Sequence, residues 1–235
     1  MRTAPDFSMN AQLSSELLTR SAEDYLKAIY RLTLGGSLAG TTELAQALDL
    51  APASVSGMVK RLAEQGFVEH EPYRGVTLSL EGRRVALRMV RRHRMIEAYL
   101  VGFLGYTWDT VHEEAERLEH AVSDALIERM ARALGDPRVD PHGDPIPSAD
   151  GSIAELVSVP LTDIPTGETA IIRQVNTGQA DRLRYLAGYG LTPGTSVTVL
   201  DRQPFDGPVT VEHDGSHHVL GAEIARLLLC SRPDA

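Results

Sequence analysis

The sequence predicts a mainly α-helical chain that ends in a small, mostly β domain. Three observations support this fold class. Apolar residues recur at helical spacing through most of residues 21–134, six of the 13 prolines fall in residues 136–165, and alternating segments dominate from about Thr166. With 235 residues, of which 43% are hydrophobic, the chain can build a proper core in one large domain or two smaller ones.

The charge distribution and the cysteine count limit the binding partners and the cellular compartment that fit this protein. Taken alone, the net charge of −9 argues against binding to nucleic acid. The charge is unevenly distributed, however: the net charge is +4 for residues 20–94, −8 for residues 95–150 and −4 for residues 151–235. A basic region followed by an acidic one indicates two tasks on one chain. The single cysteine, Cys230, excludes an internal disulfide framework, no apolar run is long enough to span a membrane, and the polar N-terminus lacks a signal-peptide core. We therefore expect a cytoplasmic protein without membrane contact.

The first predicted elements are three helices. Residues 21–36 have helical apolar spacing, with Ser21 as the expected N-cap and Asp24 as the acid of a capping box. Two shorter helices are predicted at 41–50 and 51–65. Pro52 suits the first turn of the later one, because its missing N–H has no partner there in any case.

A β-hairpin follows these helices. Residues 67–84 alternate around a turn at residues 73–75, which read Tyr-Arg-Gly. Short helices followed by a two-stranded wing are the layout of a winged helix-turn-helix. We therefore predict a DNA-binding domain over residues 1–80.

The remaining chain predicts two more domains and a linker. Residues 81–104 form a long predicted helix and residues 111–134 another helical unit, within a second domain at 81–147. The proline-containing stretch 148–165 is a predicted linker. Residues 166–235 contain three strand-like segments, ETAIIRQV, TSVTVLDR and GPVTVEHDG, and one intervening helix. These segments predict a small, mostly β barrel.

The stretch VHEEAERLEH at residues 111–120 is the strongest chemical signal. Its like charges repel one another at helical spacing. On one helical wheel four of its side chains cover only about 100° and border the apolar face: His112, Glu116, Glu119 and His120. The preceding helix adds His93 and Glu97 at i,i+4. Half-buried carboxylates and imidazoles need compensation, which a divalent cation supplies, so we expect a metal site between two helices.

Other interpretations of this stretch remain open or fail on spacing. An exposed acidic helix face is the simplest alternative. A zinc-protease helix requires His-Glu-x-x-His, and here His112-Glu113 is followed by Glu116. A di-iron bundle requires Glu-x-x-His, which the stretch lacks. We therefore expect no enzymatic activity and no small-molecule substrate.

Several segments in order give the chain a family resemblance. It resembles the diphtheria toxin repressor and manganese transport regulator family of metal-dependent transcription factors. The resemblance rests on SAEDYLKAIYRL, on the helix-turn-helix and wing from TTELAQALDL to LEGRRVA, on RRHRMIE, on VHEEAERLEHAVSD and on HGDPIP. It covers most of residues 21–147 and, more loosely, 166–230. It implies a helical metal-binding and dimerisation domain, an SH3-like third domain and a homodimeric repressor.

The resemblance also assigns site residues. The primary metal site of the family maps to Asp24, Glu116, Glu119 and His120. The ancillary site maps to His93, Glu97 and His112. Three-domain members can add ligands from the SH3-like domain, for which Gln179 is the first candidate here and Asp181 the alternative. Lys27 replaces a glutamate that helps the two-domain manganese regulators hold two metals, so two separated sites are expected.

The predicted ligands bear on the identity of the metal. The iron-responsive branch commonly has Met at the position of Asp24 and Cys at that of Glu116. Two acids replace soft sulfur with hard oxygen, which suits Mn²⁺ better. We therefore expect Mn²⁺, with Fe²⁺ as the alternative, and we expect Zn²⁺, Co²⁺ or Cd²⁺ to bind in vitro.

The recognition helix is expected at residues 52–65, with its N-terminal end in the major groove of a palindromic operator. The predicted DNA-contacting residues are Ala53, Ser54, Ser56, Gly57, Lys60, Arg61 and Arg74. The small residues offer few bidentate base contacts, so DNA shape should contribute to sequence choice. A metallohydrolase and a metal-trafficking accessory protein are the competing functions, and the basic region at 20–94 disfavours both.

Overall fold

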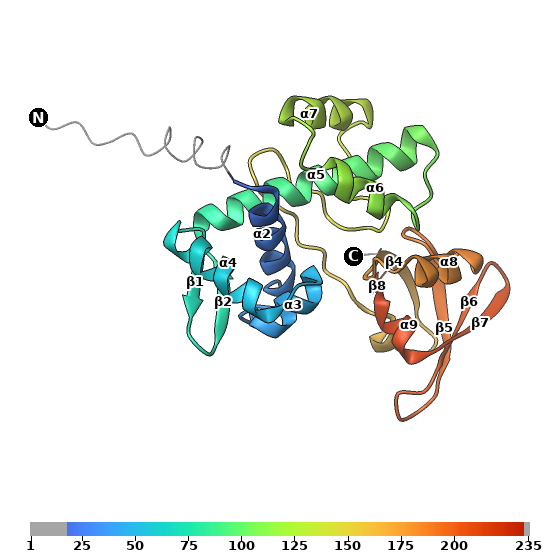
Figure 1. Ribbon diagram of the computed structural model, residues 1–235. Helices are drawn as coiled ribbons and strands as arrows, with labels where there is room; N and C mark the ends of the chain where they lie inside the picture. Colours follow the sequence, from blue (N-terminus) through green and yellow to red (C-terminus); the bar gives the residue numbers. More distant parts are fainter. Residues whose placement is uncertain (1–17, 233–235) are drawn as a thin grey trace, which may run out of the picture. The chain divides into compact units, whose positions relative to one another are not determined.

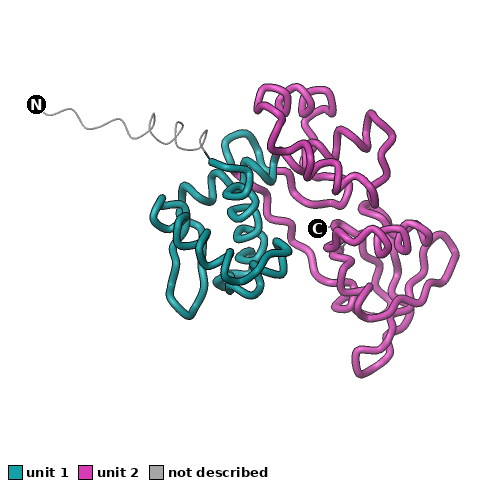
Figure 2. Tube along the Cα trace, viewed as in Figure 1, with its two compact units in different colours: residues 1–91, 147–151 teal, residues 92–146, 152–235 magenta. Residues whose placement is uncertain are grey.

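The computed structural model describes residues 18–232 and contains helices followed by a sheet domain (Figure 1). The polar N-terminal segment, on which the expected lack of a signal peptide rests, lies mostly outside the described residues. The chain divides into two compact units (Figure 2). The first comprises the described residues up to Arg91 with Pro147–Gly151, and the second comprises Arg92–Ile146 and the residues from Ser152 onward.

The first unit has the predicted helix order. It contains α2 (Arg20–Leu32), α3 (Thr41–Leu48), α4 (Pro52–Glu64), β1 (Val68–Glu71), β2 (Gly75–Leu78) and the first part of α5 (Leu80–Leu104). Leu26, Leu44 and Leu62 are fully buried, one from each of the first three helices. The predicted N-cap Ser21 was wrong. The N-cap lies two residues earlier, at Thr19, whose side chain accepts a hydrogen bond from the amide of Ala22.

The predicted wing is present as an antiparallel pair of strands. Val68 lies opposite Leu78, and Glu71 lies opposite Gly75. Gly75 has a φ of +135°, and a β-carbon there would lie 2.7 Å from the carbonyl oxygen of Ala39. Only glycine allows the chain to pass so close to its neighbour. Three helices followed by this hairpin confirm the winged helix-turn-helix.

The second unit begins with the helical region. It contains the rest of α5, α6 (Val111–Leu118) and α7 (Asp124–Ala133). The single helical unit predicted at 111–134 is therefore two helices. Ser123 starts the second of them by accepting a hydrogen bond from the amide of Leu126. A continuous helix would place Leu126 on the same apolar face as Val111 and Ala115, but Leu126 is 41% exposed, whereas those two residues are buried.

The C-terminal part of this unit is a six-stranded sheet with the order β3-β8-β4-β5-β6-β7. Its elements are β3 (Val159–Pro160), the 3-10 helix η1 (Leu161–Asp163), β4 (Thr169–Val175), α8 (Ala180–Gly188), β5 (Ser196–Arg202), β6 (Val209–His213), β7 (Ser216–Leu220), α9 (Ala222–Leu227) and β8 (Leu228–Ser231). This is the expected SH3-like domain. None of the described helices has both the length and the apolar character needed to cross a membrane.

The beginning of the sheet domain lies within the stretch that the prolines marked as a linker. Residues 159–160 pair with β8, and Leu161 and Ile164 are buried in the core of the sheet domain. The strand is too short for alternation to reveal it, and Pro160 is tolerated because this strand is at the edge of the sheet. The single cysteine, Cys230, is a free and buried thiol on β8.

Candidate metal centre

Helix α5 supplies two buried polar side chains to the candidate centre. His93 and Glu97 are one helical turn apart and each is only 2% exposed. Their neighbours Met95 and Ile96 belong to the core of the helical region. The helix therefore directs an imidazole and a carboxylate into the protein interior, as the i,i+4 spacing predicted.

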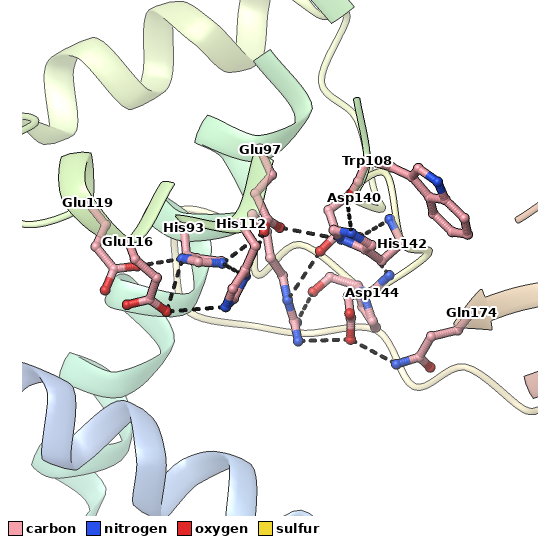
Figure 3. Close-up of polar contacts among 12 residues, drawn as sticks. His93, Glu97, Trp108, His112, Glu116, Glu119, Asp140, His142, Asp144 and Gln174 are labelled. Carbon is pink, nitrogen blue, oxygen red and sulfur yellow. Dashed lines mark hydrogen bonds and ion pairs between the residues drawn. The ribbon is translucent and has the colours of Figure 1, made fainter. Parts of the chain in front are cut away.

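Helix α6 brings His112 against this pair. The Nε2 atom of His93 lies 3.0 Å from Oε1 of Glu97 and 3.0 Å from Nδ1 of His112 (Figure 3). The same Nδ1 lies 3.1 Å from Oε1 of Glu97. Donor atoms that share one octahedral divalent cation are also about 3 Å apart. The three residues predicted as the ancillary site are thus brought together with spacing that fits a metal.

The end of α6 and the turn after it add a second set of donors. Glu119 is fully buried, and its Oε2 lies 2.6 Å from Nδ1 of His93. Its other oxygen lies 3.3 Å from Nε2 of His120. Glu116 is half-buried, with Oε1 3.8 Å from Nδ1 of His93. The primary and ancillary sites were expected to be separate. The contact between Glu119 and His93 instead joins the residues of both sites into one continuous chain of polar contacts.

The ionisation of Glu97 makes this chain of polar contacts suitable for binding a cation. Burial alone raises the pKa of Glu97, but the three surrounding histidines outweigh it and hold that pKa well below its ordinary value of 4.5. A buried carboxylate that stays ionised requires positive partners. Oxygen and imidazole nitrogen donors without sulfur match the preferences of Mn²⁺ and Fe²⁺. The donor set therefore fits a divalent metal.

Two buried residues beside these polar contacts, His142 and Asp140, were not predicted from the sequence. Nδ1 of His142 lies 3.8 Å from Oε2 of Glu97, and its Nε2–H donates to the carbonyl oxygen of Trp108 at 2.7 Å. Burial lowers the pKa of His142, but the Glu97 carboxylate raises it more, to about 9. Burial, followed by the charges of Asp144 and Glu97, raises the pKa of Asp140 to about 7. The only signal was the HGDPIP motif, whose prolines and glycine look like a loop.

The two remaining predicted metal ligands are Asp24 and Gln179. Asp24 is half-buried on α2, in the first compact unit, and stays a predicted ligand. Gln179 is exposed and precedes α8. The adjacent Gly178 is near the centre, since a β-carbon on it would lie 3.9 Å from Nε2 of His112. The side chain of Gln179 would have to turn inward to act as a ligand.

The predicted DNA contacts share one property in the structure. All of them are exposed: Ala53, Ser54, Ser56, Gly57, Lys60, Arg61 and Arg74. On α4, Val55, Val59 and Leu62 are buried, so the opposite face of the helix is available. Arg74 lies on the turn of the wing and pairs with Glu71 at 2.5 Å. Entry into the major groove requires an exposed helix face, which the N-terminal part of α4 has.

Three arginines on α5, Arg91, Arg92 and Arg94, form hydrogen bonds or ion pairs within the protein. Arg92 binds Asp124 at 2.7 Å, and Arg91 donates to the carbonyl oxygen of Pro147 at 2.7 Å. Arg94 donates to the carbonyl oxygen of Pro145 at 2.5 Å. These side chains therefore bind partners within the protein, whereas the cations predicted to contact DNA are exposed on α4 and the wing.

A buried group of imidazoles and carboxylates on a chain with a winged helix-turn-helix defines the class of metal-dependent DNA-binding regulators. Residues 17–76 match the iron dependent repressor N-terminal DNA binding domain, and residues 79–148 match the iron dependent repressor metal binding and dimerisation domain. Residues 159–232 match the FeoA domain.

Individual relatives agree with these matches. The iron-dependent repressor IdeR of Mycobacterium tuberculosis is 31% identical over 214 residues, which cover 86% of this chain and 92% of the relative. The diphtheria toxin repressor of Corynebacterium diphtheriae is 29% identical over 221 residues, which cover 90% and 96%. A solved manganese-dependent transcriptional repressor in complex with manganese has a TM-score of 0.82 and 39% identity, with 90% of this chain and 99% of that chain covered. The chain belongs to the diphtheria toxin repressor family of metal-dependent transcriptional regulators, as its motifs predicted.

Proposed function

We propose that this protein is a homodimeric, cytoplasmic transcriptional repressor that requires Mn²⁺ to bind a palindromic operator. The observation that carries the proposal is the buried chain from Glu97 through His93 to Glu119, in a protein with an exposed recognition helix. Exposed Phe103 and Leu104, 54% and 59% accessible at the end of α5, support a dimer contact in the helical region. The exposed face of α4 favours a regulator over an enzyme or a metal-trafficking accessory protein.

Mn²⁺ is the proposed metal because every candidate ligand offers oxygen or nitrogen. Glu116 and Asp24 supply carboxylates where the iron-responsive branch has sulfur. The solved repressor with manganese and the manganese regulator SloR, at 31% identity and a TM-score of 0.75, are both named for this metal. Fe²⁺ is the alternative, since IdeR is named as iron-dependent.

The protein's own carboxylates explain why metal should be required. A bound divalent cation supplies the positive charge that Glu97, Glu119 and Glu116 share. Without it, Glu119 depends on His93 and His120, and Glu116 lies close to the imidazoles of His93 and His112. We propose that Asp24, on α2, is the remaining ligand of the primary site. Metal binding by Asp24 then holds this first helix of the DNA-binding domain in one of several arrangements. The metal can favour that arrangement only to the extent that it binds this arrangement more tightly than the others.

Metal dependence of DNA binding tests the function directly. A duplex selected from random sequence by the Mn²⁺-loaded protein should be bound about 100-fold more weakly after chelation, within the usual range of coupling between two sites. Fluorescence anisotropy at fixed ionic strength measures both affinities, since phosphate contacts make them salt-dependent. Titrations with Mn²⁺ and Fe²⁺, the latter without oxygen, rank the metals. Equal affinity with and without metal would contradict the proposal.

The role of Asp24 gives a second test. Asp24→Ala should keep the fold and the dimer, retain metal at His93, Glu97 and His112, and lose most of the Mn²⁺-dependent gain in operator affinity. The reason is that the variant lacks only the proposed ligand on α2. Operator titration at saturating Mn²⁺ measures the loss, and sedimentation checks the dimer. If the variant dimerises and binds operator as tightly as the unchanged protein, Asp24 serves only to stabilise the start of α2.

A further inference from the structure

The segment Asp140–Asp144 is a compact turn with its own internal hydrogen bonds. Oδ1 of Asp140 accepts from the amides of His142 at 2.8 Å and Asp144 at 3.0 Å. The amide of Gly143 donates to the carbonyl oxygen of Asp140 at 3.0 Å, and Gly143 has a φ of +85°. Asp140 and His142 are both buried. These hydrogen bonds join the five residues into one closed turn.

One side of this turn is attached to α5, which carries the candidate metal ligands. His142 forms an ion pair with Oε2 of Glu97 at 3.8 Å. Arg94 donates to the carboxylate of Asp144 at 3.1 Å. Oε1 of Glu97 faces His93 and His112, so the two oxygens of this carboxylate have different tasks (Figure 3).

The other side of the turn is attached to strand β4 of the SH3-like domain. The amide of Val175 donates to the carbonyl oxygen of His142 at 2.9 Å. The side chain of Gln174 donates to Asp144 at 2.8 Å. A β-carbon on Gly143 would lie 1.9 Å from the carbonyl oxygen of Arg173, so the two backbones are in direct contact. The same short segment therefore contacts both Glu97 and the SH3-like domain.

Trp108 reinforces this connection. Its ring stacks on that of His142, with centroids 5.9 Å apart and 22° between the planes. Its carbonyl oxygen accepts from Nε2 of His142, and its side chain packs against the core of the SH3-like domain. Because Nε2 is held in this way, Nδ1 is directed at Glu97. A second hydrogen bond that fixes a ring is the usual device for orienting groups around a metal.

We propose that His142 is a positioning residue for Glu97, and that residues 140–144 couple metal binding to the docking of the SH3-like domain. His142 holds Oε2 so that Oε1 stays directed at His93 and His112. A Glu97 fixed at Oε1 in turn gives His142 a fixed partner, which keeps the turn against β4. Each event therefore favours the other, as linkage requires. The coupling rests on the proposed function, because it assumes that Glu97 binds metal.

The amide of Val175 reports docking directly, and Ile172 on the same strand is an internal control. The amide of Ile172 donates to the carbonyl oxygen of Thr195 within the SH3-like domain. Cd²⁺ is a diamagnetic probe, so NMR can follow hydrogen exchange in the full-length protein. Saturating Cd²⁺ should slow exchange at Val175 by about tenfold and change exchange at Ile172 by less than about twofold.

Two substitutions at His142 separate positioning from a general structural role. In His142→Gln the amide can still donate to the carbonyl oxygen of Trp108, but the contact with Glu97 is lost. In His142→Asn the amide occupies the place of Nδ1 and can still donate to Glu97. We expect about tenfold weaker Cd²⁺ binding and no Cd²⁺ effect at Val175 for the Gln variant. The Asn variant should recover part of both. Unchanged Cd²⁺ affinity and an unchanged Val175 response in the Gln variant would overturn the positioning role.

A variant on the SH3-like side tests the coupling from the opposite end. Gln174→Met removes the hydrogen bond to Asp144 without touching a candidate ligand, and should weaken Cd²⁺ binding severalfold. Gln203→Met is the matched control, because Gln203 is exposed and donates to Asp201, near the end of β5. Equal Cd²⁺ affinity of the two variants would overturn the coupling. If the unchanged protein binds Cd²⁺ and Val175 does not respond, only this coupling fails. If it binds neither Cd²⁺ nor Mn²⁺, the proposed function fails with it.

Discussion

Replacing Glu119 with glutamine is expected to weaken Mn²⁺ binding at least about 100-fold and to remove the Mn²⁺-dependent part of operator binding. Loss of an outer hydrogen-bonding partner already weakens metal sites by about 10–100-fold, and Glu119 is proposed to be a direct ligand. Its carboxylate is fully buried between His93 and His120. The amide has the same shape but no charge, so Glu119→Gln replaces a charged oxygen donor with a weaker neutral one while filling the same space.

The measurements for this variant are Mn²⁺ titration calorimetry and operator anisotropy. The stability of the metal-free protein should hold or rise, because an uncompensated buried charge destabilises a fold. Glu113→Gln is the matched control, since it makes the same charge change on α6 where the side chain is 85% exposed. The assignment would fail if both variants responded to Mn²⁺ as the unchanged protein does.

Replacing Glu116 with cysteine is the second change with a large expected effect. A thiolate replaces a carboxylate, so the preference should move by about tenfold or more from Mn²⁺ toward Fe²⁺, Co²⁺ and Zn²⁺. Glu116 is suited to this test because it is half-buried, with Oε1 3.7 Å from Nε2 of His112 and 3.8 Å from Nδ1 of His93. The new side chain can therefore be accommodated without opening the core.

The comparison for this variant is the ratio of operator affinities with each metal at matched free concentration. Glu116→Ser is the control, because it removes the carboxylate without adding sulfur and should weaken activation by every metal. Co²⁺ absorption gives a second readout, since a thiolate ligand adds a charge-transfer band. If Glu116→Cys and Glu116→Ser show the same ratios, Glu116 is not a ligand.

Local patterns in the sequence determined most elements and both ligand pairs on helices. Helical spacing alone places His93 with Glu97, and His112 with Glu116, on one helix face each, because the side chains at i and i+4 point the same way. Alternation and a glycine at a turn likewise predicted the wing between residues 68 and 78. These features depend on neighbours a few residues apart, which periodicity detects.

The tertiary structure alone decided how these faces meet. The rotation of α6 against α5 places Glu119 on His93, 26 residues away, and so joins two groups expected to be separate. The helix that a continuous pattern had implied ends at Leu118, and Ser123 begins a new one. His142 reaches Glu97 because β4 and Trp108 fix the turn that carries it. Such contacts arise from packing between distant segments, and no local period in the sequence encodes them.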